Sequence, residues 1–254
     1  MADSYNLEIT VDTLDRALAA ERGGAHRIEL CSHLSNGGLT PGIQLMRLTR
    51  EQVRLPIFAM IRPRAGDFVY SGAEFAQMQR DIAAAAEVGV DGVVLGILTG
   101  DGHVDVERTR ELVEQARPLP VTFHRAFDIS TDLRKSLEDV IRTAAVRILT
   151  SGGAANALEG RRQLAELVRR ARGRITIVSG AGITAANADL IAKQTGAREF
   201  HAGLSSIVIG ADRNGDRFEA EVRKLREQLR ISCQARVRFA DPNPGNERKN
   251  FNPT

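Results

Sequence analysis

Hydrophobic and polar residues alternate in eight short segments of the chain, and a segment with apolar residues at helical spacing follows each of them. Alternation with a period of two predicts β-strands, and apolar residues every three or four positions predict amphipathic helices. The eight alternating segments cover residues 7–11, 27–31, 56–62, 91–96, 121–124, 146–150, 174–178 and 199–203. The last helical pattern contains Phe218, Val222, Leu225 and Leu229.

Eight successive strand–helix units in about 230 residues predict one closed (β/α)8 barrel, the TIM barrel fold. Strand and helix alternate without a break, and no linker separates two halves, so an open doubly wound sheet is the weaker alternative. We expect a single barrel domain over residues 5–230. A C-terminal tail over residues 231–254 is expected to be partly disordered, because its last part is rich in Asn and Pro.

Composition narrows the classes of partner. The formal net charge is only +3, the charges are interspersed, and the chain has no tryptophan and two tyrosines, so nucleic acid is not an expected partner. The first residues lack the pattern of a signal peptide, and no apolar run is long enough to span a membrane. Cys31 and Cys233 form neither a CxxC pair nor a disulfide framework, so we expect a reduced, cytoplasmic protein.

Strand alternation also predicts which side chains enter the barrel lumen. The apolar positions face the helices, so the residues between them point inward, and catalytic groups of this fold lie at the C-terminal ends of the strands. Buried charges must be paired, so we interpret Glu8, Arg27 and Glu199 as structural. The functional candidates among the inward residues are Glu29, Cys31, Arg62, His124 and His201.

Two of these candidates have a structural alternative. The stretch 122–128 ends a strand with the polar pair Thr122 and His124 facing away from apolar neighbours, which is unusual for packing alone. A core histidine bonded to a neighbour would nevertheless explain His124. Cys31 would likewise suit a small buried hydrophobic position.

Several longer runs resemble the CutC copper-homeostasis family. These runs occupy residues 27–31, 37–41, 60–64, 66–68, 122–128 and 147–153, in consistent order within roughly residues 5–205. The resemblance implies a (β/α)8 barrel, a cytoplasmic role in copper handling, often as a homo-oligomer, and copper binding by cysteines. Thr10 stands where members often have cysteine, and Ala202 and Gly203 follow His201 where Cys or Ser is commoner. Cys31 is then the retained thiol.

Two functions follow from these observations. The first is weak Cu(I) binding at the barrel mouth, with Cys31, His124 and His201 as candidate ligands. Met60 offers a thioether on a neighbouring lumen face, and we expect it to lie deeper than Cys31. The second is a TIM-barrel enzyme acting on a small anionic substrate. Its acid or base would be Glu29 or His124, and Arg62 would hold a carboxylate or phosphate.

Glycine-rich turns suggest where an anion binds. Gly180 and Gly182 follow the seventh predicted strand and Gly203 follows the eighth, where backbone N–H groups bind phosphate in many barrels. Tight strand-to-helix turns need glycine equally, so both readings stay open. We predict that sulfate or phosphate binds near Gly182 and Gly203.

The loop at residues 63–68 offers a cover for the mouth. Arg64 and Asp67 are close enough in sequence to pair across the turn, although a rigid surface turn alone would also use this proline and glycine. We predict that Phe68 and Tyr70 lie over a bound ligand.

Overall fold

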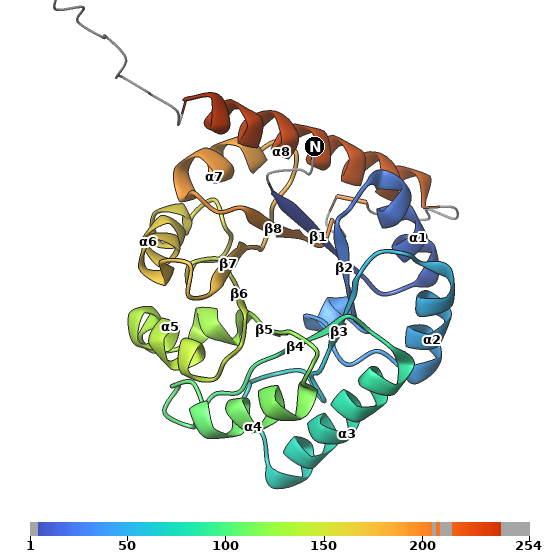
Figure 1. Cartoon of the computed structure of the whole chain (residues 1–254), viewed down its shortest axis with the longest axis vertical. Coiled ribbons are helices and arrows are strands. Elements are labelled where there is room, and N and C mark those ends of the chain that lie inside the picture. Colours follow the sequence, from blue (N-terminus) through green and yellow to red (C-terminus); the bar gives the residue numbers. More distant parts are fainter. Residues whose placement is uncertain (1–4, 205–206, 209–214, 240–254) are drawn as a thin grey trace, which may run out of the picture.

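The computed structural model describes residues 5–204, 207–208 and 215–239, and it confirms the (β/α)8 barrel (Figure 1). Eight parallel strands pair in chain order, and β8 pairs with β1 to close the barrel. The strands are β1 (Asn6–Val11), β2 (Arg27–Leu30), β3 (Ile57–Met60), β4 (Gly92–Leu95), β5 (Val121–Phe123), β6 (Arg147–Thr150), β7 (Thr176–Ser179) and β8 (Glu199–Ala202).

A ring of helices covers the outer face of these strands (Figure 1). The helices are α1 (Leu14–Gly23), α2 (Ile43–Gln52), α3 (Gly72–Val88), α4 (Val106–Ala116), α5 (Leu133–Arg142), α6 (Arg161–Ala171), α7 (Ala188–Thr195) and α8 (Asp216–Phe239), with short 3-10 turns η1 (Leu34–Asn36) and η2 (Arg125–Ile129). The outward strand residues Leu7, Ile9 and Ile28 are fully buried against this ring. No helix among the described residues is both long and apolar enough to cross a membrane.

Local sequence sets where the helices begin and end. Ser71 and Glu74 form a reciprocal capping box that starts α3, and Asp132 accepts the backbone N–H groups that start α5. Gly24 ends α1 in the left-handed region at φ 86°, which a residue with a side chain rarely adopts. These caps satisfy the otherwise unpaired backbone groups and fix the loops that lead to the strands.

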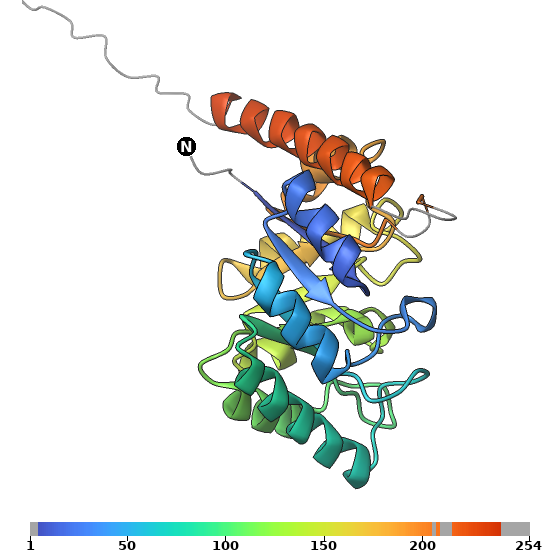
Figure 2. The same ribbon diagram turned by 90° about the vertical axis from the view of Figure 1, so that its right-hand side faces the viewer.

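The last helix, α8, packs on α1 and α7 and lies beside both in Figures 1 and 2. Its predicted apolar positions, Phe218, Val222, Leu225 and Leu229, are all fully buried. Gly23 allows a close approach, because a Cβ there would lie 2.6 Å from the Val222 Cβ.

The end of α8 differs from the boundary that we predicted. The helix continues past residue 230, where the sequence predicts the tail to begin, and ends at Phe239. Ser232 is still buried, and its hydroxyl group donates to Asp189 Oδ1 on α7, so the packing surface extends beyond the predicted boundary. The rest of the predicted tail, residues 240–254, lies outside the described residues.

Candidate functional site

The C-terminal ends of the strands enclose a cavity of about 200 Å³ at the barrel mouth. Six residues that the sequence nominates line it together: Glu29, Cys31, Arg62, His124, His201 and Gly203. Strands β2, β3, β5 and β8 bring them to one place, because each of these residues lies in or just after the C-terminal end of its strand. The predicted roles of these residues depend on what each side chain contacts.

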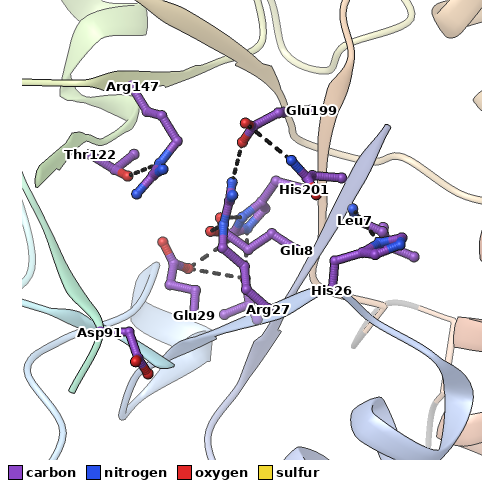
Figure 3. Close-up of polar contacts among 12 residues, drawn as sticks. Leu7, Glu8, His26, Arg27, Glu29, Asp91, Thr122, Arg147, Glu199 and His201 are labelled. Atoms are coloured by element: carbon purple, nitrogen blue, oxygen red, sulfur yellow. Dashed lines mark hydrogen bonds and ion pairs between the residues drawn. The ribbon is translucent and has the colours of Figure 1, made fainter. Parts of the chain in front are cut away.

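Glu8, Arg27 and Glu199 form the paired lumen charges that we predicted (Figure 3). The Arg27 guanidinium donates a hydrogen bond from Nε to the Glu8 carboxylate, and its Nη2 atom lies 2.6 Å from Glu199 Oε2. Burial opposes the charge of Glu8, but Arg27 and His201 outweigh it and hold the pKa of Glu8 well below its usual value. Glu8 is therefore an ionised structural group.

His201 continues this network toward the mouth. Its Nδ1 lies 2.7 Å from Glu8 Oε1, and its Nε2 lies 2.6 Å from Thr10 Oγ1 and 3.7 Å from Glu29 Oε2. Burial opposes a charged ring, but Glu29 and Glu8 outweigh it and raise the pKa of His201. Both ring nitrogens already have partners, which disfavours the predicted role of His201 as a copper ligand.

Thr10 is a site residue to which the sequence reasoning gave no role of its own. Its hydroxyl group donates to Glu29 Oε2 at 3.0 Å and also contacts His201, so it links the two. The signal was present, because alternation along β1 points Thr10 inward one position beyond Ile9. We predicted that Thr10 points inward and noted it as the place of a missing cysteine, but not that its hydroxyl group forms a hydrogen-bond link.

Glu29 is buried with one oxygen held and one available. Oε2 accepts from Thr10 and lies 3.6 Å from Cys31 Sγ, whereas Oε1 has no hydrogen-bond partner among the described residues. Burial raises the pKa of Glu29 above its usual value. A buried carboxyl group of this kind can exchange a proton with a ligand nearer to neutral pH than an exposed one.

Glu8, Glu29 and His201 also form a possible cation cluster, since one ligand atom from each lies within 4.8 Å of the others. Carboxylate and imidazole groups suit hard or borderline divalent ions. However, both Glu8 oxygens already bond Arg27 and His201, and the Arg27 charge repels a cation. The cluster is better described as a charge network.

His124 presents a hydrogen-bond donor to the cavity. Its Nδ1 accepts the Ala126 backbone N–H at 3.2 Å, so the neutral ring carries its proton on Nε2, which has no partner among the described residues. Burial, with a further contribution from Arg62, lowers the pKa of His124 to about 3. The ring is therefore neutral at neutral pH, and it is neither a strong base nor, in this tautomer, a metal ligand.

A missing side chain on β4 makes room for this ring. Gly96 follows the strand directly, and a Cβ there would lie 2.5 Å from His124 Nδ1. The Phe68 ring also packs against His124, with the two ring centroids 4.8 Å apart. The orientation of His124 is therefore fixed by its neighbours.

Arg62 is used differently from our prediction. Its Nη1 and Nη2 atoms donate, at 3.0–3.3 Å, to the backbone carbonyl groups of Asn36, Gly37, Gly38 and Gly66, so the guanidinium holds two loops together. Only Nε has no partner among the described residues. Arg62 cannot grip an anion with both arms of the guanidinium, because those arms bind the chain itself.

Cys31 and Met60 lie at one level, and the prediction that Met60 lies deeper is wrong. The β2–β3 register pairs Leu30 with Ala59, so the next residues, Cys31 and Met60, are neighbours on the same wall of the cavity. They pack in one apolar cluster with Phe58. Burial and then Glu29 raise the pKa of the Cys31 thiol well above its usual value, so the thiol is protonated.

The loop after β3 partly matches our prediction of a cover. Arg64 and Asp67 pair as predicted, with Nη2 2.8 Å from Oδ1. Phe68 lines the cavity, and the Arg62 guanidinium carbon lies 4.7 Å from its ring centroid. Tyr70 is buried in the main core and is not among the lining residues, so the prediction that it covers a ligand is wrong, while that for Phe68 stays a prediction.

The three glycines that we predicted to bind an anion do not all lie at the same cavity. Gly203 lines the cavity, whereas Gly180 and Gly182 do not. The Gly180 N–H donates to Thr150 O, and a Cβ there would lie 2.4 Å from Leu149 Cδ1, so close packing explains this glycine. Gly182 has a positive φ of 69°, which a tight turn explains. Anion binding near Gly182 and Gly203 stays a prediction.

A larger hollow of about 590 Å³ opens at the opposite end of the barrel. It lies at the N-terminal ends of β7 and β8, and Tyr5, Thr176 and Glu199 are among its lining residues. We place the functional site at the smaller cavity, since this fold carries its chemistry at the C-terminal ends of the strands.

Comparisons with known proteins agree with the fold and the signature runs. A model of the CutC family matches residues 5–208. A family protein CutC from Xanthomonas campestris pv. campestris is 44% identical over 234 residues, covering 89% of this chain and 98% of the relative. A copper homeostasis protein cutC homolog from Homo sapiens is 46% identical over 205 residues, covering 81% of this chain and 75% of the relative.

Solved structures also show similarity to a CutC protein and to the barrel fold. The crystal structure of a CutC protein from Streptococcus agalactiae is similar with a TM-score of 0.74 and 33% identity, over 78% of this chain and 97% of that one. A thiamine phosphate pyrophosphorylase from Pyrococcus furiosus has a TM-score of 0.60 at 17% identity, over 91% of this chain and 98% of that one. That second likeness shows the barrel fold alone.

Proposed function

The chain belongs to the CutC family, and we propose that it serves copper homeostasis by holding Cu(I) weakly at the barrel mouth. Relatives named for copper homeostasis support the general role. One observation supports the site: the Cys31 thiol and the Met60 thioether share one wall of the cavity. We also propose that the protein acts in the cytoplasm as a homo-oligomer, as the family resemblance implies.

The two sulfur atoms explain why this site would prefer Cu(I) and why its affinity would be modest. Thiolate and thioether ligands suit Cu(I). A Cβ on Gly38 would lie 3.1 Å from Cys31 Sγ and 3.7 Å from Met60 Cε, so both side chains approach the same point. Cu(I) must displace the thiol proton from a buried group, and no second thiol lines the described cavity. Modest affinity follows.

A competition titration with a Cu(I) chelator tests this site. We expect Cys31→Ser to weaken Cu(I) binding by about tenfold or more, and Met60→Leu to weaken it less, because thiolate is the stronger ligand. Cys233→Ser serves as the matched control, since Cys233 lies outside the residues that match the family. Equal affinity of the wild type and Cys31→Ser would remove Cys31 from the site.

A second candidate function is an enzyme that acts on a small anionic substrate. It is favoured by three buried polar atoms without partners among the described residues, Glu29 Oε1, Arg62 Nε and His124 Nε2, which belong to side chains lining one cavity. Buried polar atoms are normally paired, so three unpaired atoms on side chains around one cavity need an explanation, and a bound ligand provides one. A bound substrate would satisfy all three.

We propose a role for each group in such an enzyme. Glu29 takes a proton from the carbon next to a carbonyl or carboxyl group. The N–H groups of His124 and Arg62 donate to the oxygen on which negative charge develops. His124 thus acts as a donor and Glu29 as the base, which narrows the two assignments that the sequence left open. Returning the proton to the same or a neighbouring carbon completes the reaction without an oxidant.

Hydrogen–deuterium exchange at carbon tests the enzyme. Wild-type protein in D2O should accelerate exchange at C3 of pyruvate or C2 of L-lactate, followed by NMR. Glu29→Gln should lower the accelerated rate by about a hundredfold or more, because the proton acceptor is lost. His124→Phe should also lower it, while His124→Gln keeps a donor and should retain part of the rate. The absence of acceleration with either probe would count against this function.

A further inference from the structure

We infer that the mouth cavity binds a small carboxylate with a hydroxyl group on the neighbouring carbon, in preference to a phosphate. The inference rests on the second function proposed above, the binding of a small anionic substrate, and it specifies the class of that substrate. Three features of the cavity lead to this inference: a buried cationic side chain, and, among the described residues, two hydrogen-bond donors without partners and one hydrogen-bond acceptor without a partner.

The buried cation is Arg62. Its side chain lies at the cavity wall with 7% of the residue exposed, and among the described residues it forms no ion pair with a carboxylate. Its four hydrogen bonds go to backbone carbonyl groups, which carry only partial charges. A buried charge without a counter-ion is unfavourable, so a ligand that brings one negative charge is complementary to this cavity.

The available donors match a carboxylate. Two buried N–H groups of side chains that line the cavity have no partner among the described residues, Arg62 Nε and His124 Nε2, and a carboxylate has two oxygens to accept them. A phosphate presents more oxygens and a larger charge, and it is usually bound by a guanidinium fork or by several backbone N–H groups. Here both arms of the guanidinium hold the loops, and the Gly180 N–H donates to Thr150.

The acceptor is Glu29 Oε1. It is buried and has no partner among the described residues, while Oε2 is held by Thr10. A hydroxyl group on the ligand can donate to Oε1, which a simple alkanoate cannot do. The cavity of about 200 Å³ also has the apolar walls Leu34, Phe68 and Leu149, so it suits a ligand of a few carbon atoms.

Calorimetric titration with three probes tests this inference on the full chain: L-lactate, propionate and inorganic phosphate. L-lactate and propionate share the carboxylate and differ in the hydroxyl group. We expect L-lactate to bind about tenfold more tightly than propionate, and more tightly than phosphate by a similar factor or more. His124→Phe should weaken L-lactate and propionate alike, while Glu29→Met should remove the preference for L-lactate. His103→Gln, a partly exposed position outside the cavity, is the control.

The outcomes separate this inference from the function on which it rests. Phosphate binding as tight as that of L-lactate, or equal binding of propionate and L-lactate by the wild type, would overturn the inference. If none of the three probes binds, the proposed small-substrate function fails and takes the inference with it. If L-lactate binds with the expected preference but no exchange at carbon occurs, the ligand class stands and the enzyme proposal fails. The wild-type comparison decides these points even if a variant does not fold.

Discussion

Glu8→Ala should lower the free energy of unfolding by about 3–5 kcal/mol, the range typical of removing one partner from a buried ion pair. Glu8 is almost completely buried and bonds both Arg27 and His201. Without it, Glu199 at 2.6 Å is the one carboxylate that still pairs with Arg27 among the described residues, and the His201 ring loses the acceptor of its Nδ1. Urea unfolding at neutral pH, followed by circular dichroism, measures the loss.

Glu199→Ala is the matched control for this prediction. Glu199 bonds the same guanidinium, but its side chain is 14% exposed, so water replaces the lost contact more readily. We expect a clearly smaller loss of stability than for Glu8→Ala. A loss of less than about 1 kcal/mol for Glu8→Ala would mean that the lumen charges are solvated and would contradict the network.

The pH dependence of the Glu8 contribution has a definite sign. Arg27 and His201 hold the pKa of Glu8 in the folded protein well below its ordinary value of 4.5, which applies when the chain is unfolded. The stabilising contribution is therefore fully present above that ordinary value and decreases as the pH falls below it. The difference in stability between wild type and Glu8→Ala should shrink in acid, where Glu8 is protonated. It should also decrease as the pH rises through the raised pKa of His201, because Glu8 stabilises the charged ring.

Arg62→Met should lower the free energy of unfolding by about 2–4 kcal/mol, because charge-assisted hydrogen bonds to four carbonyl groups are lost together. Methionine has a similar length and no charge, so the change leaves the volume nearly intact. The loops at residues 36–38 and 66 lose their shared donor. We also expect L-lactate binding to disappear, because the buried cation is removed. Urea unfolding and calorimetry measure the two effects separately.

Arg64→Met provides the comparison for Arg62→Met. Arg64 lies two residues further on and also donates to backbone carbonyl groups, those of Ala65, Asp67 and Val69. Its side chain is 36% exposed, so water can replace these contacts and the ion pairs with Asp67 and Glu74, and their loss should affect stability much less. If the two variants unfolded alike, the burial of the carbonyl contacts of Arg62 would not be the source of its effect. If Arg62→Met bound L-lactate as the wild type does, the cavity would not need that charge.

The sequence predicts the barrel and the direction of most lumen side chains because successive side chains of a barrel strand alternate between two environments, the lumen and the helix layer. Alternation alone directed Glu8, Glu29 and His201 inward, and the lumen contacts among them confirm this. The need to pair buried charges then anticipated the ion pairs of Arg27. These inferences depend only on neighbours in the sequence and on the low polarity of the lumen.

The contacts across loops could not be predicted in the same way. Strand alternation predicts that Arg62 points inward. It does not predict that the Arg62 guanidinium donates to backbone carbonyl groups of two separate loops. The depth of Met60 depends on the stagger between β2 and β3, which counting along one strand cannot give. Gly96 matters only through the His124 ring that it accommodates, and no pattern in the sequence links the two.

The lumen network also connects the two ends of the barrel. Glu199 lines the hollow at the N-terminal ends of the strands, and Glu29 lines the cavity at the mouth. Between them runs an unbroken series of polar contacts through Arg27, Glu8, His201 and Thr10. Since each member polarises the next in a medium of low dielectric constant, we expect a charge bound in the hollow beside Glu199 to shift the pKa of Glu29 at the mouth. The lumen network thus couples the two ends of the barrel electrostatically.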